Sequence, residues 1–142
     1  MSTSSLFTFQ SRVRFGDTDA SGRIFYASLL RHFDAAETEL LRHLGCAYGD
    51  FREPKILFPR VHVDCDYTSS IVFDDLMHIE VSVPAVGRSS FTLEFGVAVD
   101  GRPAARGKLV IVAVDPKTQR STPIPEELRL ALAGYSSRNH TA

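Results

Sequence analysis

The sequence has little of what marks a secreted, membrane-spanning or nucleic-acid-binding protein. It contains only two cysteines, Cys46 and Cys65, whose spacing is not that of a metal site. The most apolar stretch, residues 109–114, is far too short to cross a bilayer, and residues 1–10 lack the basic start and apolar run of a secretory signal. The net charge of −1 provides no broad basic surface for nucleic acid. These absences predict a cytoplasmic enzyme or binding protein without a metal.

The composition that remains is that of an ordinary globular chain. Hydrophobic residues make up 44% and charged residues 23% of the 142 residues. A chain of this length suits one domain with one sizeable core, and we expect residues 1–142 to form it.

Hydrophobic periodicity predicts one long helix among several strands. Apolar residues recur at three- and four-residue steps over about residues 24–44, a helix of about 30 Å, and Gly45 follows as a stop. Alternation predicts strands over residues 7–15, 61–67, 77–83, 91–99 and about 103–115, and Pro125 opens a short helix to residue 132. Consecutive strands favour antiparallel pairing, with the long helix covering one face of the sheet, which is an α+β fold.

The chemically informative segment lies between the first strand and the long helix. Asp17 and Asp19 stand two residues apart there, among turn-forming Gly, Thr and Ser. Such residues often serve only as turns and helix caps. Alternatively, the unpaired N–H groups of a helix start can stabilise an oxyanion, and a carboxylate beside them can attack a carbonyl or activate water. Gly22 would let a substrate approach the backbone closely. Spacing alone does not choose between the two aspartates.

The same segment resembles the signature of 4-hydroxybenzoyl-CoA thioesterase-type hotdog enzymes. The matching pattern is Arg12-Val13, four residues, Thr18-Asp19, two residues and Gly22. The resemblance continues through residues 32–45, 64–76 and 86–91, and it covers roughly residues 7–120. It implies the hotdog fold, in which a five-stranded antiparallel sheet wraps a long central helix. It also implies that sites form between subunits, in dimers that usually pair into tetramers.

The resemblance assigns roles to individual positions. It implies Asp19 as the catalytic carboxylate and the backbone N–H of Tyr26 as the group that polarises the thioester carbonyl. It further implies that Asp34 lies near the acyl pocket and that the Arg88-Ser89-Ser90 turn contacts the phosphates of CoA. The same turn could also be an ordinary polar turn.

The sequence departs from the family at two positions. Arg23 replaces the usual Ile or Val after Gly22, and Leu29 replaces a usual Tyr. In the family both positions line the region of the acyl group. The two changes therefore argue against the family's aromatic substrate, whereas the catalytic position is unchanged. The side chains of Phe25 and Tyr26 are expected to pack, and Glu37 is expected at a solvated helix edge.

The leading hypothesis is hydrolysis of an acyl-CoA thioester, with no cofactor beyond the CoA of the substrate. Asp19 would act as nucleophile or general base. A carrier-protein-bound acyl chain is a close alternative to CoA. A dehydratase would need a His beside the carboxylate, and the sequence offers none near Asp19. A non-catalytic acyl-CoA-binding module would not need the carboxylate.

Overall fold

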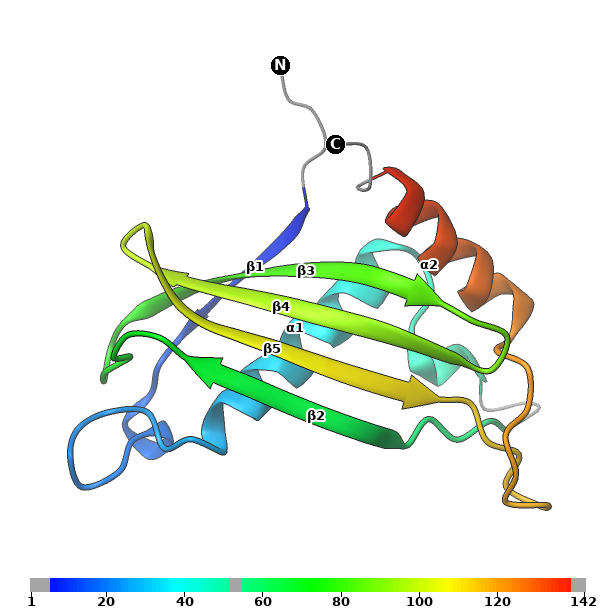
Figure 1. Cartoon of the computed structure of the whole chain (residues 1–142), viewed down its shortest axis with the longest axis horizontal. Helices are drawn as coiled ribbons and strands as arrows, with labels where there is room; N and C mark the ends of the chain where they lie inside the picture. The colour runs from blue at the N-terminus through cyan, green and yellow to red at the C-terminus, as the bar shows by residue number, and fades with distance from the viewer. Residues whose placement is uncertain (1–5, 52–54, 139–142) are drawn as a thin grey trace.

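The computed structural model describes residues 6–51 and 55–138, which contain two α-helices, two short 3-10 helices (Phe15–Asp17 and Tyr48–Phe51) and one sheet (Figure 1). The elements are β1 (Phe7–Arg12), α1 (Ser28–His43), β2 (Arg60–Tyr67), β3 (Leu76–Val86), β4 (Ser90–Val99), β5 (Arg102–Val112) and α2 (Glu126–Arg138). The five strands pair antiparallel in the order β1-β3-β4-β5-β2. The predicted α+β class and its five-stranded antiparallel sheet are confirmed. None of the helices in the described residues is long and apolar enough to cross a membrane.

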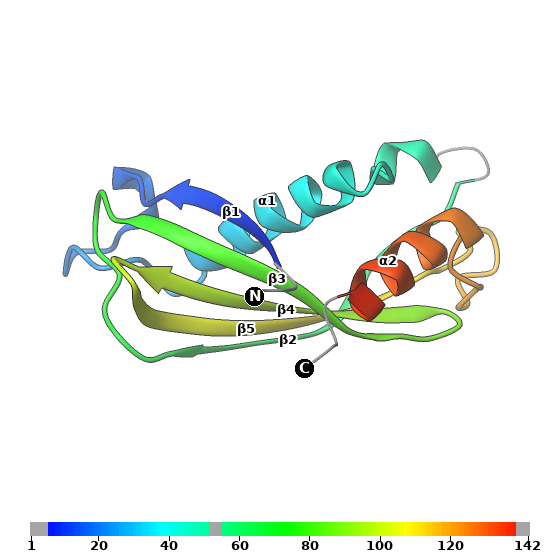
Figure 2. The ribbon, with the colours of Figure 1, turned by 90° about the horizontal axis from the view of Figure 1, so that it is seen from above.

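Helix α1 packs along one face of the sheet, and α2 lies on the same side (Figure 2). The ring of Phe33 on α1 stacks on Phe95 of β4, with centroids 4.4 Å apart and an interplanar angle of 10°. Gly107 of β5 faces the same ring, because a Cβ built there would lie 2.2 Å from Phe33. Glycine at this position therefore lets the helix approach the sheet closely. The residues that α1 buries share the predicted spacing; the apolar ones are Leu29, Phe33, Ala36, Leu40 and Leu41.

Helix α2 is longer than its predicted span of residues 125–132. Its second half docks on β3 through hydroxyl groups, since Tyr135 donates to the carbonyl of Val81 at 2.5 Å and Ser136 donates to that of Val83 at 2.6 Å. The predicted end was too early, because buried Tyr135 continues the helical spacing of Leu128 and Leu132. The hydroxyls of Tyr135 and Ser136 are bound to the sheet.

The structure also corrects the boundaries around the loop that joins β1 to α1. The helix begins at Ser28 rather than near Ile24, because tertiary partners occupy the earlier N–H groups. Ile24 donates to the carbonyl of Ile71 at 2.8 Å, and Phe25 donates to that of Asp17 at 2.7 Å. The first strand ends at Arg12, and Phe15, which was predicted inside it, has 80% of its surface exposed.

Strand β2 forms one edge of the sheet and pairs only with β5 (Figure 1). Its alternating valines, which predicted the strand, lie outside the core, since Val61 and Val63 are 62% and 49% exposed. Helix α1 does not cover this strand, so both of its faces and its free backbone edge remain accessible.

Candidate active site

The loop at residues 13–27 carries both candidate carboxylates and is closed by its own backbone. The N–H of Gly22 donates to the carbonyl of Asp19 at 3.0 Å, and the N–H of Asp19 donates to that of Arg23 at 2.9 Å. Gly22 has φ of 81°, a left-handed conformation that favours glycine, and open space lies above its Cα. The glycine thus serves the turn and leaves room beside it.

The carboxylate of Asp19 is exposed and fixed through one oxygen. Its Oδ1 accepts hydrogen bonds from the N–H of Ser21 at 2.8 Å and from the Ser21 hydroxyl at 2.6 Å. These bonds, with a smaller contribution from the charge of Arg23, lower the pKa of Asp19 below its ordinary value. Within the described part of the chain, Oδ2 has no hydrogen-bond partner. Asp19 is therefore oriented, ionised at neutral pH and able to engage another molecule.

Asp17 has the opposite environment. Its Oδ2 accepts from the N–H of Arg14 at 2.8 Å and lies 3.0 Å from Nε2 of His32, a buried residue of α1. On the other side of the ring, Nδ1 of His32 lies 2.6 Å from the hydroxyl of Ser11. The expectation that no His lies beside this loop was wrong for Asp17. Since both ring nitrogens are engaged and the ring is 8% exposed, the chain Ser11–His32–Asp17 anchors the loop to α1 and β1.

Tyr26 lies two residues before the first residue of helix α1. No residue of the described chain accepts a hydrogen bond from the Tyr26 N–H, whereas its carbonyl accepts one from the hydroxyl of Tyr67 on β2. The rings of Phe25 and Tyr26, which were expected to pack, contact each other with centroids 4.7 Å apart, but they are 43% and 69% exposed. A backbone N–H without an acceptor, on the same loop as an exposed carboxylate, is one of the features expected of an acyl-transfer site.

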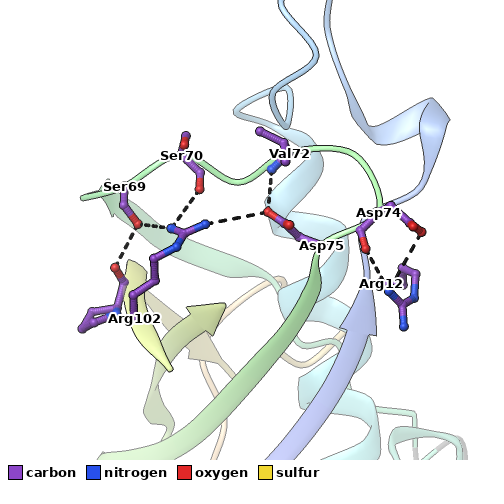
Figure 3. Close-up of polar contacts among 8 residues, drawn as sticks. Arg12, Ser69, Ser70, Val72, Asp74, Asp75 and Arg102 are labelled. Carbon is purple, nitrogen blue, oxygen red and sulfur yellow. Dashed lines mark hydrogen bonds and ion pairs between the residues drawn. The ribbon is translucent and has the colours of Figure 1, made fainter. Parts of the chain in front are cut away.

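A second loop, residues 68–75, lies against the Asp19 loop and is held by two arginines (Figure 3). Arg102 donates to the Ser69 hydroxyl at 2.6 Å and to the Ser70 carbonyl at 3.1 Å, and it lies 4.0 Å from Asp75. Arg12 donates to the carbonyl of Asp74 at 2.8 Å. This network fixes the wall of the site before any ligand binds.

Asp34 and Glu37 lie farther along α1, away from Asp19. Glu37 is 1% exposed, so the solvated edge that was expected for it is wrong. Arg60 and the hydroxyl of Tyr48 both donate to its Oε2, and burial together with Glu37 raises the pKa of Tyr48. Asp34 is exposed, two helical turns from the start of α1, and contributes to raising the pKa of Arg60. Within one chain, the carboxylate of Asp34 therefore interacts electrostatically with Arg60.

The predicted CoA-binding turn lies at the other end of the sheet from Asp19 (Figure 1). Arg88, Ser89 and Ser90 connect β3 to β4, whereas the Asp19 loop borders the beginning of β3. Eleven residues of β3 separate the two ends, about 35 Å at the rise of a strand. Arg88 borders a hollow of about 490 Å³ together with Arg129 of α2. One chain does not bring Asp19 and this turn together.

Two hollows bear on the position of the site. One of about 540 Å³ lies on the outer face of the sheet, where His78, Glu80 and Arg106 border it, away from the loop carboxylates. Another of about 360 Å³ adjoins the Asp19 loop and includes Arg23 and Tyr67. We assign the candidate site to the second, because Arg23, which lines it, accepts the hydrogen bond from the N–H of Asp19 through its carbonyl. Across residues 6–51 and 55–138, no group of three His, Cys, Asp or Glu side chains could hold a metal ion.

Sequence reasoning missed three features of this site: His32 beneath the loop, the burial of Glu37 against Arg60, and the wall formed by residues 68–71. None had a local signal, since each contact joins segments that are distant in the sequence. The sequence offered only indirect signs of a polar pocket, namely Arg23 after the glycine and the carboxylate of Asp34.

A sheet of this order around one long helix, with a loop carboxylate at the helix start, defines a hotdog-fold acyl-transfer protein. The family model of the thioesterase-like superfamily matches residues 13–132, and the chain belongs to this family. The predicted family, hotdog fold and class of thioester hydrolase are thereby confirmed.

Three relatives illustrate the similarity. The 1,4-dihydroxy-2-naphthoyl-CoA hydrolase of Synechococcus elongatus is 29% identical over 125 residues, which cover 87% of this chain and 92% of the relative. The acyl-CoA thioester hydrolase YbgC of Escherichia coli is 24% identical over 124 residues, which cover 87% and 92%. The solved structure of a gentisyl-coenzyme A thioesterase superposes with a TM-score of 0.79 at 33% identity and covers 88% of this chain and 98% of that one.

Proposed function

We propose that the protein hydrolyses acyl-CoA thioesters to a free acid and CoA, with Asp19 as its catalytic carboxylate. The observation that carries the proposal is the difference between the two loop acids. The side chain of Asp17 is only 14% exposed and is bound by the backbone of Arg14 and by His32, whereas Asp19 is exposed and its carboxylate is bound only by Ser21. The substrates that its relatives are named for support CoA as the thiol rather than a carrier protein.

The reaction places the thioester carbonyl between Asp19 and the N–H of Tyr26. That N–H would donate to the carbonyl oxygen as negative charge develops there. Asp19 either attacks the carbonyl carbon, which expels the CoA thiolate and leaves a mixed anhydride for water to cleave, or accepts a proton from the water that attacks directly. A burst of thiol release in the first turnover identifies the anhydride route. Gly22 leaves space beside the carbonyl.

The test is Asp19→Asn, measured by release of CoA thiol from a panel of aromatic and aliphatic acyl-CoA esters. We expect kcat to fall by about 10²- to 10⁴-fold, because the amide is neither a nucleophile nor a base. The Ser21 bonds can persist, so circular dichroism should show an intact fold. Glu80→Gln, an exposed carboxylate on the outer sheet face, is the matched control and should leave turnover unchanged. Near-normal turnover of folded Asp19→Asn would refute the assignment.

We further propose that the active enzyme is a homo-oligomer, a dimer or a dimer of dimers, in which two β2 edges associate. In support, β2 has a free edge with exposed Val61 and Val63, and the nearby Tyr26 is 69% exposed. A second copy could also bring its Arg88 turn towards Asp19, which one chain cannot do. The Cys65 thiol on this strand agrees with the reducing cytoplasm as the proposed location.

The oligomer is tested by analytical ultracentrifugation of the intact protein. Val63→Lys should shift the protein towards monomer and reduce turnover, because a charge then lies on the associating edge. Thr8→Lys, on the opposite edge strand β1, is the control and should retain the assembly. A wild-type protein that is monomeric and fully active would contradict this proposal and leave the Asp19 assignment standing.

A further inference from the structure

The hollow beside the Asp19 loop combines an apolar floor with polar walls. Its volume is about 360 Å³, and the buried side chains of Ile24 and Ile71 form part of its lining. The polar residues Arg23, Thr68 and Ser70 also line it. The hollow can therefore accept a short apolar segment that ends in a polar group.

The backbone ties this hollow directly to the reacting end of the site. Arg23 accepts the hydrogen bond from the N–H of Asp19 through its carbonyl, and an isolated antiparallel bridge joins it to Val72. Tyr67, which borders the hollow, donates to the carbonyl of Tyr26. A group bound here lies within reach of a carbonyl held at Asp19 and Tyr26, which is where the acyl part of a thioester begins.

The two arginines nearest the hollow differ in their partners. Arg102 is bound to Ser69, Ser70 and Asp75, as Figure 3 shows. The exposed guanidinium of Arg23 has neither a hydrogen bond nor an ion pair within the described residues.

The hydroxyls of Thr68 and Ser70 are likewise without partners in the described part of the chain. An uncommitted guanidinium beside two hydroxyl donors is suited to a carboxylate or another anion. Arg102, which is already engaged, serves to fix the wall.

We propose that this hollow binds the acyl part of the substrate and that Arg23 selects acyl groups ending in a carboxylate, as in half-thioesters of short dicarboxylic acids. The methylene chain would lie on Ile24 and Ile71, and the terminal carboxylate would accept hydrogen bonds from Arg23 and the Ser70 hydroxyl. The proposal rests on the proposed thioesterase function and names its substrate class. The same anion chemistry could bind a CoA phosphate, which the experiment separates.

The experiment compares glutaryl-CoA with pentanoyl-CoA, which have the same number of acyl carbons, for the wild type and Arg23→Gln. The wild type should hydrolyse glutaryl-CoA with a kcat/KM at least about tenfold higher. Arg23→Gln should lose about tenfold or more on glutaryl-CoA and less than about twofold on pentanoyl-CoA, because only one of them carries the charge. Arg23→Lys should restore part of the preference, and Arg120→Gln, an exposed arginine in the turn after β5, should change neither rate.

Glutaryl and pentanoyl thioesters of N-acetylcysteamine, which lack every phosphate, complete the test. The Arg23 effect should persist on the glutaryl ester. If Arg23→Gln lowered kcat/KM equally for both CoA esters and for neither N-acetylcysteamine ester, Arg23 would bind a CoA phosphate and the proposal would be overturned. Equal wild-type rates on the glutaryl and pentanoyl esters would also overturn it. Binding of both CoA esters to Asp19→Asn provides a readout without catalysis. If the protein bound glutaryl-CoA in preference to pentanoyl-CoA but the wild type did not hydrolyse it, the thioesterase function would be refuted and the proposed acyl pocket would stand.

Discussion

Helix α1 is completed by different means at its two ends. At the C-terminal end, the N–H of Gly45 donates to the carbonyl of Arg42 at 3.0 Å and the N–H of Cys46 to that of Leu41 at 2.8 Å, which satisfies carbonyls that the helix leaves open. At the N-terminal end, Ala27 provides no side-chain cap, and the Tyr26 N–H has no acceptor in the described residues. At the N-terminal end the N–H groups of Ser28 and Leu30 donate to the carbonyls of Phe25 and Ala27, whereas the Tyr26 N–H remains available to another molecule.

The charged groups follow the same division. Glu37, in the second half of α1, is buried and paired with Arg60, so its charge serves the fold. Asp19, before the first turn, is fully exposed and held only by its neighbour Ser21. Buried, satisfied groups contribute to stability, whereas exposed and oriented ones are available for chemistry. Substitutions at the two ends should therefore separate stability from activity.

The largest effect on stability is expected from Arg60→Met. This change leaves the Glu37 carboxylate buried without its cation, and one of its oxygens already has no partner among the described residues. Unfolding free energy, measured by urea titration, should fall by about 3–5 kcal/mol. The double variant Glu37→Leu with Arg60→Met should recover much of this loss, because no buried charge remains. A double variant as unstable as Arg60→Met alone would show that Arg60 stabilises this end of the helix by packing rather than by its charge.

Glycine-to-alanine changes at the two ends give a matched pair of intermediate size. Gly22 and Gly45 have φ of 81° and 78°, and both have open space above Cα. Each alanine should therefore lower the unfolding free energy by about 1–2 kcal/mol. Only Gly22→Ala should also lower kcat/KM, by about tenfold or more, because it displaces the Asp19 turn. Equal activity of the two variants would show that the turn tolerates the change and that Gly22 serves conformation alone.

The sequence predicted the features that depend on local pattern. Apolar spacing located α1, and Gly45 marked its end. Both signals depend only on residues that are close together in the sequence. The start was placed four residues early, because Ile24 and Phe25 give their N–H groups to partners in distant or looped segments. The spacing of apolar residues does not predict hydrogen bonds to such distant segments.

The sequence singled out the loop that carries the two candidate carboxylates, but it did not predict the contacts that this loop makes. The resemblance distinguished Asp19 from Asp17, which spacing left equal, and the structure supplies the physical difference through His32. The position of His32 on α1 does not reveal that it faces the loop, and Glu37 has its cation 23 residues away on β2. Contacts of this kind follow from the packing of elements, which the sequence pattern alone does not specify.

The smallest effect concerns the pH dependence of stability at Asp17. Burial raises the pKa of this carboxyl, but the N–H of Arg14 and the contact with His32 lower it more, so the folded value lies below the ordinary 3.8. The folded state then binds this proton less tightly than the unfolded chain. Its contribution to stability is therefore complete above about pH 4 and is lost as the pH falls through the lower folded value.

Asp17→Asn should remove this contribution, and urea titrations at about pH 6 and pH 3 measure it. The wild type should lose more stability than the variant between these two values, with the gap opening only below about pH 4. Glu80→Gln, which is exposed, should follow the wild type and so controls for the loss of a carboxyl group. Parallel losses in wild type and Asp17→Asn would mean that the Ser11–His32–Asp17 chain does not anchor the loop. The difference between the two loop acids would then rest on exposure alone.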